Sequence, residues 1–484
     1  MSPPATTRQA EVAAMFARYG PAYRWWAVLT VMLGTVSAVM EATIANVAMP
    51  QIIKVFALGH DRVQLLSTGF LAATTASMLV SQWAIGRYGI RRTYIGALVL
   101  LMLFSVLATL SSEFVLLATC RIMQGAIAGL IQPLAMVTLV DVFPLQERGR
   151  AMSVYGLGIV LAPAVGPVAG GLLVDHFGWR AVFLVTLPFC ALALALAPRY
   201  MVRGMAPAGR AEATLDVASL ALLGAALSGL LGGLAALLAQ PGPALAAIAA
   251  GLVLSALFLI RQKRSAHPLL DLDIFRHPGF GWAVLVATAY GMGIYGSTYV
   301  APLYAQSGAG FSASEAGAML VPGGILLALV LLVSGRLADR FPANRVAMAG
   351  LACFALSSLL LGVAAQGGGI SASFWSLAAL VALGRVGLGL VIPGLNAGAL
   401  RLLPHGVEPA GAATINFSRQ LGGAFGVTLL ALFLEWRQRG FESLDAAAGD
   451  LRRDLGYGEG FFIIALVYAL ALLPAWRMTA PQHR

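Results

Sequence analysis

The segments GRYGIRR at residues 86–92 and GRLADRF at residues 335–341 are two copies of one short polar motif. Each copy follows a long apolar run, and RIMQG at residues 121–125 matches RVGLG at residues 385–389 in the same way. A glycine-rich stretch in the fifth run likewise matches one in the thirteenth. The members of each pair are eight apolar runs apart, so runs 1–6 repeat as runs 9–14, and runs 7 and 8 are an insert.

The composition indicates a membrane protein. The chain has 484 residues, of which 59% are hydrophobic and only 11% are charged. Soluble domains carry about 25% charged residues, and apolar runs of about 18 residues or more are long enough to cross a bilayer as helices. The predicted spans are residues 26–48, 63–85, 94–111, 114–138, 150–174, 180–198, 216–238, 243–261, 279–304, 314–335, 346–366, 374–400, 411–434 and 460–477. The sequence therefore predicts an all-α polytopic membrane protein with fourteen transmembrane helices.

The repeat divides the chain into units. The predicted units are a cytoplasmic N-terminal segment (1–25), an N-terminal six-helix bundle (26–200), two inserted helices with cytoplasmic linkers (201–278), a C-terminal six-helix bundle (279–477) and a cytoplasmic tail (478–484). The two longest connections, residues 262–278 and 435–459, are too short to form a domain. Two six-helix repeats around a central cavity are the plan of rocker-switch transporters.

The positions of the basic residues decide how the net charge of +11 is interpreted. Of the 31 basic residues, 21 lie on one predicted side of the membrane and 7 on the other. The remaining three, Arg121, Arg385 and Arg419, lie inside predicted spans. This distribution argues against nucleic-acid binding, and the positive-inside rule puts both termini in the cytoplasm. The first apolar run is too long for a signal peptide and is expected to stay as a membrane helix.

Glu41 is the only acidic residue deep inside a predicted span, in MEATIANVAMP at residues 40–50. A carboxylate in hydrocarbon is costly unless it faces a partner, a cavity or a proton, so Glu41 is a candidate for proton coupling. By helical rise, Glu41 and Arg121 each lie about 10 Å below the outer end of their span, so they can meet. The alternatives are a purely structural ion pair, and an arginine that organises helix packing through backbone carbonyls.

Motifs of catalysis and ATP binding are absent from the sequence. The chain has no GxxxxGK[ST] phosphate loop, no HExxH and no visible Ser/His/Asp set. All six histidines lie in predicted loops or tails, and the three cysteines are scattered without the spacing of metal ligands. The sequence therefore predicts neither an enzyme nor a bound cofactor or metal.

These motifs resemble a known family, the fourteen-helix drug:proton antiporters of the major facilitator superfamily (the QacA/EmrB group). Residues 40–50 are similar to the family's first-helix signature, in which aspartate usually stands at the position of Glu41. Residues 121–125 are similar to its fourth-helix motif, whose arginine is implicated in proton coupling. The resemblance implies the major facilitator fold, two six-helix repeats plus two inserted helices, with proton coupling by Glu41 and Arg121.

The resemblance also implies residues that gate the transporter. In the fifth helix, Gly166, Pro167 and Gly170 belong to a stretch similar to the family's antiporter motif, which allows close packing and bending. Simple small-residue packing is the alternative. The polar motif supplies four more expected gating residues, namely Arg87, Arg91, Asp339 and Arg340. Only the second copy keeps the acid of the family pattern, because Gly86 replaces it in the first copy. A solvated positive loop is the alternative there.

A central cavity is expected to bind the substrate. The residues expected to line it are Asn46, Gln124, Tyr295, Tyr299, Arg385, Asn416 and Arg419. Tyr295 and Tyr299 are four residues apart and share a helix face, although ordinary packing would produce the same pattern. Arg385 and Arg419 either bind backbone carbonyls or give the cavity a positive character that favours anionic substrates. At the outer end of the tenth span, Ser312 and Glu315 have the spacing of a capping box.

The expected function is proton-coupled export of lipophilic compounds across the bacterial inner membrane by alternating access. The expected partners are lipophilic small molecules, protons and the bilayer. Gram-negative relatives of the EmrB type work with a periplasmic adaptor protein, and the sequence leaves that partner open. A narrow-substrate metabolite exporter or proton symporter of the same fold is the main alternative. A membrane enzyme or receptor is the weaker one, because the chain has no catalytic cluster or appended sensory domain.

Overall fold

The computed structural model describes residues 7–78, 80–143, 155, 158, 166, 168–203, 216–265, 268–367, 372–404, 407–439 and 446–478. The described part is helical, with short connections and no strand. Within it, eleven helices are long and apolar enough to cross a membrane. The prediction of an all-helical membrane protein is confirmed, and the count of fourteen spans stays a prediction.

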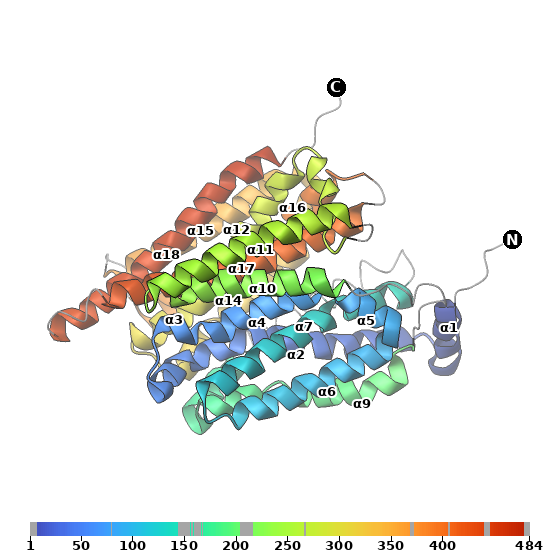
Figure 1. Ribbon diagram of the computed structural model, residues 1–484, viewed down its shortest axis with the longest axis horizontal. Coiled ribbons are helices and arrows are strands. Elements are labelled where there is room, and N and C mark those ends of the chain that lie inside the picture. Colours follow the sequence, from blue (N-terminus) through green and yellow to red (C-terminus); the bar gives the residue numbers. More distant parts are fainter. Residues whose placement is uncertain are drawn as a thin grey trace.

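The N-terminal half is a helical bundle (Figure 1). Its main elements are α2 (Tyr23–Phe56), α4 (Leu65–Met78), α5 (Ser81–Tyr88), α6 (Ile90–Thr109), α7 (Phe114–Val142), the helix Val168–Phe177 and α9 (Leu187–Tyr200). The remaining elements are α1 (Thr7–Tyr19), α3 (His60–Val63) and the 3-10 helix η1 (Trp179–Leu184). Within this bundle α7 packs against α2, α4 and α6, so it occupies a central position.

The C-terminal half repeats this packing. Its elements are η2 (Asp273–Arg276), α12 (Phe280–Ser307), α13 (Ala313–Ala318), α14 (Val321–Arg340), α15 (Ala343–Ala365), α16 (Phe374–Leu400), α17 (Glu408–Arg439) and α18 (Ala446–Arg477). Helix α16 packs against α14 and α15 as α7 packs against α4 and α6, and α12 packs against α18 as α2 packs against α9. The two halves meet where α4 contacts α17 and α2 contacts α12.

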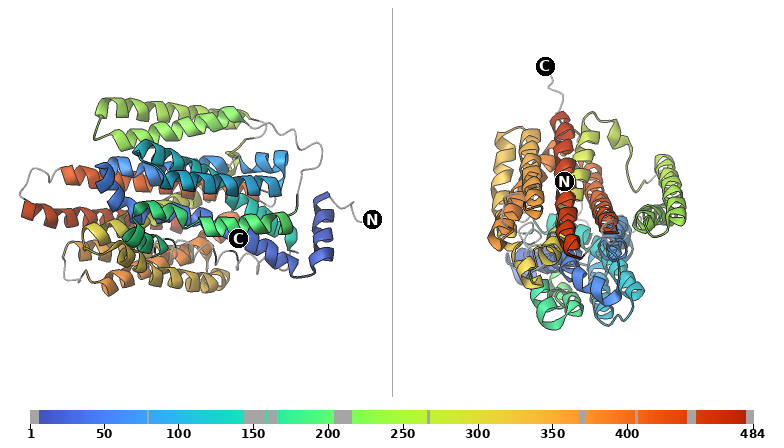
Figure 2. Two further views of the ribbon diagram at one scale, coloured as in Figure 1. Left: turned by 90° about the horizontal axis from the view of Figure 1, so that it is seen from below. Right: turned by 90° about the vertical axis from the view of Figure 1, so that its left-hand side faces the viewer.

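Two helices lie outside both bundles. Helices α10 (Val217–Ala236) and α11 (Pro241–Arg264) form a hairpin that stands at the periphery in both views of Figure 2. Helix α10 packs against α4 and α17, one from each half. At the base of the hairpin, Asp216 accepts a hydrogen bond from Ser219 N at 3.0 Å and pairs with Arg261 at 2.8 Å. The hairpin therefore covers one edge of the contact between the halves.

Most residues of the two polar motifs lie in helices, whereas the sequence predicted them in the loops that follow the spans. Residues 86–88 belong to α5 and residues 335–340 to α14, so the helices continue for about one turn beyond their predicted ends. Gly89 ends α5 with φ of 80°, a conformation that glycine adopts at little cost. The sequence prediction ends each span where its hydrophobic run ends. The backbone hydrogen bonds of the helix continue past that point, through residues with polar side chains.

The prediction of a long loop at residues 435–459 is wrong, because here too the helices extend beyond their apolar runs. Helix α17 extends to Arg439, and α18 begins at Ala446. Arg439 pairs with Glu435 one turn away, and Arg437 forms an ion pair with Glu459 of α18. Charged side chains here stabilise helix ends that project beyond the apolar spans.

The capping box predicted at the start of the tenth span is confirmed. Glu315 N donates to Ser312 Oγ at 3.2 Å, and Ser312 N donates to Glu315 Oε2 at 2.8 Å. These bonds satisfy two backbone donors that the first turn of α13 would otherwise leave free.

Candidate functional site: a buried ion pair beside a central cavity

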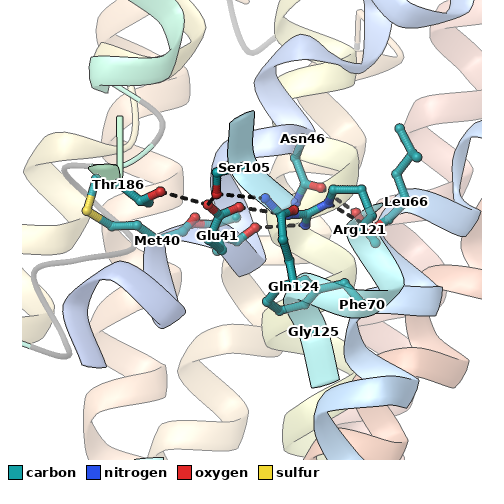
Figure 3. A network of polar contacts seen from close by, with 12 residues as sticks. Met40, Glu41, Asn46, Leu66, Phe70, Ser105, Arg121, Gln124, Gly125 and Thr186 are labelled. Atoms are coloured by element: carbon teal, nitrogen blue, oxygen red, sulfur yellow. Dashed lines mark hydrogen bonds and ion pairs between the residues drawn. The ribbon is translucent and has the colours of Figure 1, made fainter. Parts of the chain in front are cut away.

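Glu41 and Arg121 form an ion pair in the interior of the N-terminal half (Figure 3). Arg121 Nη1 donates to Glu41 Oε2 at 2.9 Å, and Nη2 donates to the backbone oxygen of Glu41 at 2.8 Å. Both side chains are fully buried. The structure thus brings together the two residues that the depth argument paired, on α2 and α7.

Three polar side chains complete the network around the carboxylate. Ser105 Oγ and Thr186 Oγ1 donate to Glu41 Oε1 at 3.2 and 2.8 Å, and Gln124 Nε2 donates to Ser105 Oγ at 2.9 Å. Both carboxylate oxygens therefore have partners, as a buried charge requires. Sequence reasoning missed Ser105 and Thr186, because single hydroxyl residues in apolar helices are common and carry no positional signal.

Arg121 also has neutral acceptors. Its Nε donates to Leu66 O at 3.3 Å and its Nη1 donates to Gln124 Oε1 at 3.0 Å, in addition to the Glu41 backbone oxygen. The guanidinium lies over the ring of Phe70, with Cζ 4.5 Å from the ring centroid. Loss of the negative charge on Glu41 would thus leave the arginine hydrogen-bonded to neutral acceptors, while its buried positive charge would lose its counter-charge.

A cavity of about 140 Å³, partly open to solvent, lies between the two halves. Its N-terminal wall consists of Ala38, Val39, Ala42, Thr43, Phe70, Leu71, Thr74, Ala128 and Gln132. Its C-terminal wall consists of Tyr290, Ile294, Tyr295, Thr298, Leu327, Arg385, Ile392, Arg419 and Gln420. Both halves of the molecule therefore contribute side chains to the cavity.

Three of the seven residues expected in the cavity line it, namely Tyr295, Arg385 and Arg419. Gln124 belongs to the Glu41 network instead, and Asn46 bridges the two halves. Tyr299 is fully buried in α12 outside the cavity lining, and Asn416 is exposed on α17, also outside it. Tyr290, five residues before Tyr295, lines the cavity in place of Tyr299, so the i, i+4 pattern predicted the wrong partner for Tyr295.

The expected gating glycines lie against α2. A Cβ atom at Gly170 would lie 2.8 Å from Ile44 Cγ1, and one at Gly166 would lie 3.5 Å from Thr43 Oγ1. These positions therefore permit close helix contact. Pro167 lies outside the described residues.

The other expected gating residues belong to the polar motifs. Arg87 is exposed, and Arg91 Nη1 donates to Pro198 O at 3.1 Å within the N-terminal half. Asp339 and Arg340 are in the last turn of α14, and their side chains lie outside the described part of the chain.

Hydrogen bonds join the halves on one side of the cavity. Asn46 Nδ2 donates to Thr298 O at 3.2 Å, and Gln306 Nε2 donates to Val47 O at 3.1 Å. Farther along, Asp175 accepts from the backbone nitrogens of Ala313 and Ser314 at 3.2 and 2.7 Å. We refer to the contact between Asp175 and the start of α13 as the Asp175 end. Sequence analysis missed Asp175, which follows an apolar run as an ordinary loop acid would.

The geometry of the fold can now be compared with known proteins. The sequence profile of the Major Facilitator Superfamily matches residues 31–427. The chain belongs to the Major Facilitator Superfamily. Members of this family and the structural neighbours are membrane transporters, so the protein is a transporter and not an enzyme.

Several relatives are named for drug resistance. The chain is 27% identical to the methylenomycin A resistance protein of Streptomyces coelicolor, over 93% of this chain and 91% of that protein. It is 26% identical to the lincomycin resistance protein LmrB of Bacillus subtilis, over 93% and 95%. It is 29% identical to a multidrug resistance protein B homolog of Mycobacterium tuberculosis, over 84% and 75%.

Solved structures share the fold at low identity. A bacterial homolog of the human lysosomal transporter Spinster, in an inward-facing and unoccupied conformation, superposes with a TM-score of 0.67 at 15% identity. The alignment covers 95% of this chain and 98% of that one. A D-xylose-proton symporter superposes with a TM-score of 0.66 at 16% identity, over 94% and 98%. At such identities the likeness concerns the fold alone.

Proposed function

We propose that this transporter is a proton-coupled multidrug antiporter, which exports lipophilic compounds across the bacterial inner membrane in exchange for protons. The observation that carries the proposal is the Glu41–Arg121 pair, a fully buried carboxylate on a helix that also lines the central cavity. Ionisable groups inside a membrane are retained mainly for function, and proton relays are a common one. Fourteen spans and cytoplasmic termini are part of the proposal, following the repeat and the positive-inside rule.

The names of the relatives support export of drugs. Three of them are named for resistance to methylenomycin A, to lincomycin or to multiple drugs, and each aligns over most of its length. The apolar N-terminal wall of the cavity fits lipophilic compounds, because burial of their surface needs no specific partner. Aromatic side chains such as Tyr290 and Tyr295 add contact area to the opposite wall.

The conformation supports an alternating-access cycle. Among the described residues, the hydrogen bonds between the halves are the two at Asp175, Asn46 to Thr298, Gln306 to Val47, and the contact between the Thr68 and Thr428 hydroxyls. In the predicted topology, the cavity-lining residues of α2 and α4 lie on the cytoplasmic side of Asn46 and Thr68. The predicted topology puts the Asp175 end outside the cell, so we infer that this state faces the cytoplasm.

Helix α2 provides a physical route for coupling. Val39 and Ala42 of this helix line the cavity, Glu41 holds the ion pair, and Asn46 bonds to the C-terminal half. Protonation of Glu41 removes the ionic attraction to Arg121, so α2 becomes freer to shift against α7. A shift of α2 changes the cavity wall and the Asp175 end together, and substrate binding in the cavity biases the same movement.

Transport in liposomes tests this proposal. Purified protein with an imposed pH gradient is expected to move a fluorescent lipophilic dye against its concentration gradient, and nigericin, which dissipates the pH gradient, should stop that movement. Uphill dye transport that continues without any ion gradient would refute proton coupling. A susceptibility panel in expressing cells separates the alternatives, because resistance to one chemical type only would favour a narrow-substrate exporter.

A further inference from the structure

The two walls of the central cavity differ in charge. The N-terminal wall is apolar apart from Thr43, Thr74 and Gln132, whereas the C-terminal wall contains two guanidinium groups, Arg385 and Arg419. No aspartate, glutamate or lysine is present among the described residues that line the cavity. Among the described lining residues, the two positively charged arginines therefore have no acidic partner.

The donors of both arginines are largely unused. The hydrogen bond of Arg385 within the described part of the chain runs from Nη2 to Thr298 Oγ1 at 3.3 Å, although the residue is only 7% exposed. Arg419 has no hydrogen bond or ion pair with any described residue. A guanidinium carries several N–H donors in a planar fork, which matches the geometry of a carboxylate. Neither arginine is therefore occupied by backbone carbonyls of the described residues.

Tyr290 adds an independent observation. Its side chain is 1% exposed and lines the cavity, and its hydroxyl has no hydrogen-bond partner among the described residues. Arg385 and Arg419 line the same cavity as this side chain. Buried hydroxyls are nearly always hydrogen-bonded, so a hydroxyl without a partner in a cavity that also contains two cations indicates a missing acceptor. Carboxylate and phenolate oxygens are acceptors of this kind.

We propose that Arg385, Arg419 and Tyr290 form a subsite for one anionic group of a lipophilic substrate. The acid group, a carboxylate or phenolate, lies between the two guanidinium groups and accepts a hydrogen bond from the Tyr290 hydroxyl. The apolar body of the substrate packs against the opposite wall at Phe70 and Leu71. This inference rests on the proposed function, since it takes the central cavity as the transport site, and it assigns lipophilic weak acids as the preferred class.

Equilibrium binding of three matched probes tests the subsite. The probes are 9-anthracenecarboxylate, its methyl ester and 9-anthracenylmethylammonium, and binding is followed by fluorescence with purified protein in neutral detergent at pH 7. The wild type should bind the acid about tenfold or more tightly than the ester, as charge-assisted hydrogen bonds allow, and the ammonium probe weakest. Arg385→Gln and Arg419→Gln should each remove the preference for the acid, and Tyr290→Phe should reduce it severalfold.

The ester is the neutral reference, because a loss of acid binding that exceeds any loss of ester binding reports the charge-dependent contact rather than misfolding. Arg276→Gln is the matched control, since Arg276 is exposed and pairs with Asp273 outside the cavity. Equal affinity for acid and ester in the wild type would overturn the proposal, as would an acid preference that survives in the Arg385→Gln/Arg419→Gln double variant.

The assay uses no gradient, so it separates the two proposals. Tight acid binding without pH-driven transport would overturn antiport and keep the subsite. Gradient-driven transport of a neutral dye without acid preference would overturn the subsite and keep antiport.

Discussion

Arg121 and Phe70 connect the buried ion pair to the cavity. The guanidinium carbon of Arg121 lies 4.5 Å from the ring centroid of Phe70, and Phe70 lines the N-terminal wall. A cation over an aromatic face is attracted by about 0.5–2 kcal/mol, more when the pair is desolvated. One aromatic ring therefore lies between the partner of Glu41 and the central cavity.

Replacement of this ring should weaken coupling. In Phe70→Leu the cavity stays apolar but the cation–π contact is lost, so substrate binding should displace fewer protons from the purified protein. We expect proton release per bound substrate to fall by about half or more, within the range that about 1 kcal/mol allows. A pH-sensitive dye in weakly buffered detergent measures the release. Phe70→Tyr keeps the ring and should behave like the wild type, and unchanged release in Phe70→Leu would argue against this route.

Removal of the buried charge should abolish energised transport. Glu41→Gln keeps the size and hydrogen-bonding ability of the side chain but cannot exchange a proton, so uphill efflux in proteoliposomes should fall to background while membrane insertion persists. Glu41→Asp should retain partial activity, because the acid is kept at a slightly shorter reach. Asp273→Asn, at an exposed acid with its side chain 77% accessible, is the matched control. Wild-type uphill transport by Glu41→Gln would contradict the proton-carrier role.

Loss of the Asp175 carboxylate should open the Asp175 end. Asp175 accepts two backbone N–H groups at the start of α13, where the helix dipole also favours an anion. In Asp175→Asn we expect the population of the state closed at this end to fall about tenfold relative to the open one, since hydrogen bonds to charged groups contribute about 1.5–3 kcal/mol. Distances between spin labels on the two halves report the populations. Glu113→Gln, an exposed acid that makes no cap hydrogen bond to α7, should leave them unchanged.

Closure of the Asp175 end should also be sensitive to a larger side chain at Gly171. A Cβ atom there would lie 2.3 Å from the backbone oxygen of Ala313, which cannot move without shifting α13. Gly171→Ala should therefore disfavour the state closed at the Asp175 end, with the same spin-label shift and a slower transport rate. Gly96→Ala is the control, because a Cβ atom at Gly96 meets no atom within 4 Å. Similar distance distributions in Gly171→Ala and Gly96→Ala would exclude Gly171 as a determinant of closure.

The sequence alone determined the membrane class, the repeated order of helices and the pairing of Glu41 with Arg121. Hydrophobic length and charge exclusion are properties of single segments, so they are visible without a structure. The depth of Glu41 and Arg121 followed from helical rise, which is a local quantity, and it was enough to pair them. The capping box of Ser312 and Glu315 is local in the same sense.

Only the tertiary structure decided which residues face the cavity and which close it. Tyr290 and Tyr299 occupy the same helix and have the same chemistry, and the rotation of α12 in the bundle puts Tyr290 in the cavity wall and Tyr299 in the packed interior. Asp175 contacts α13 across a sequence separation of more than a hundred residues. Such contacts depend on how two half-molecules dock, and docking is set by the shape of whole helix faces rather than by any segment.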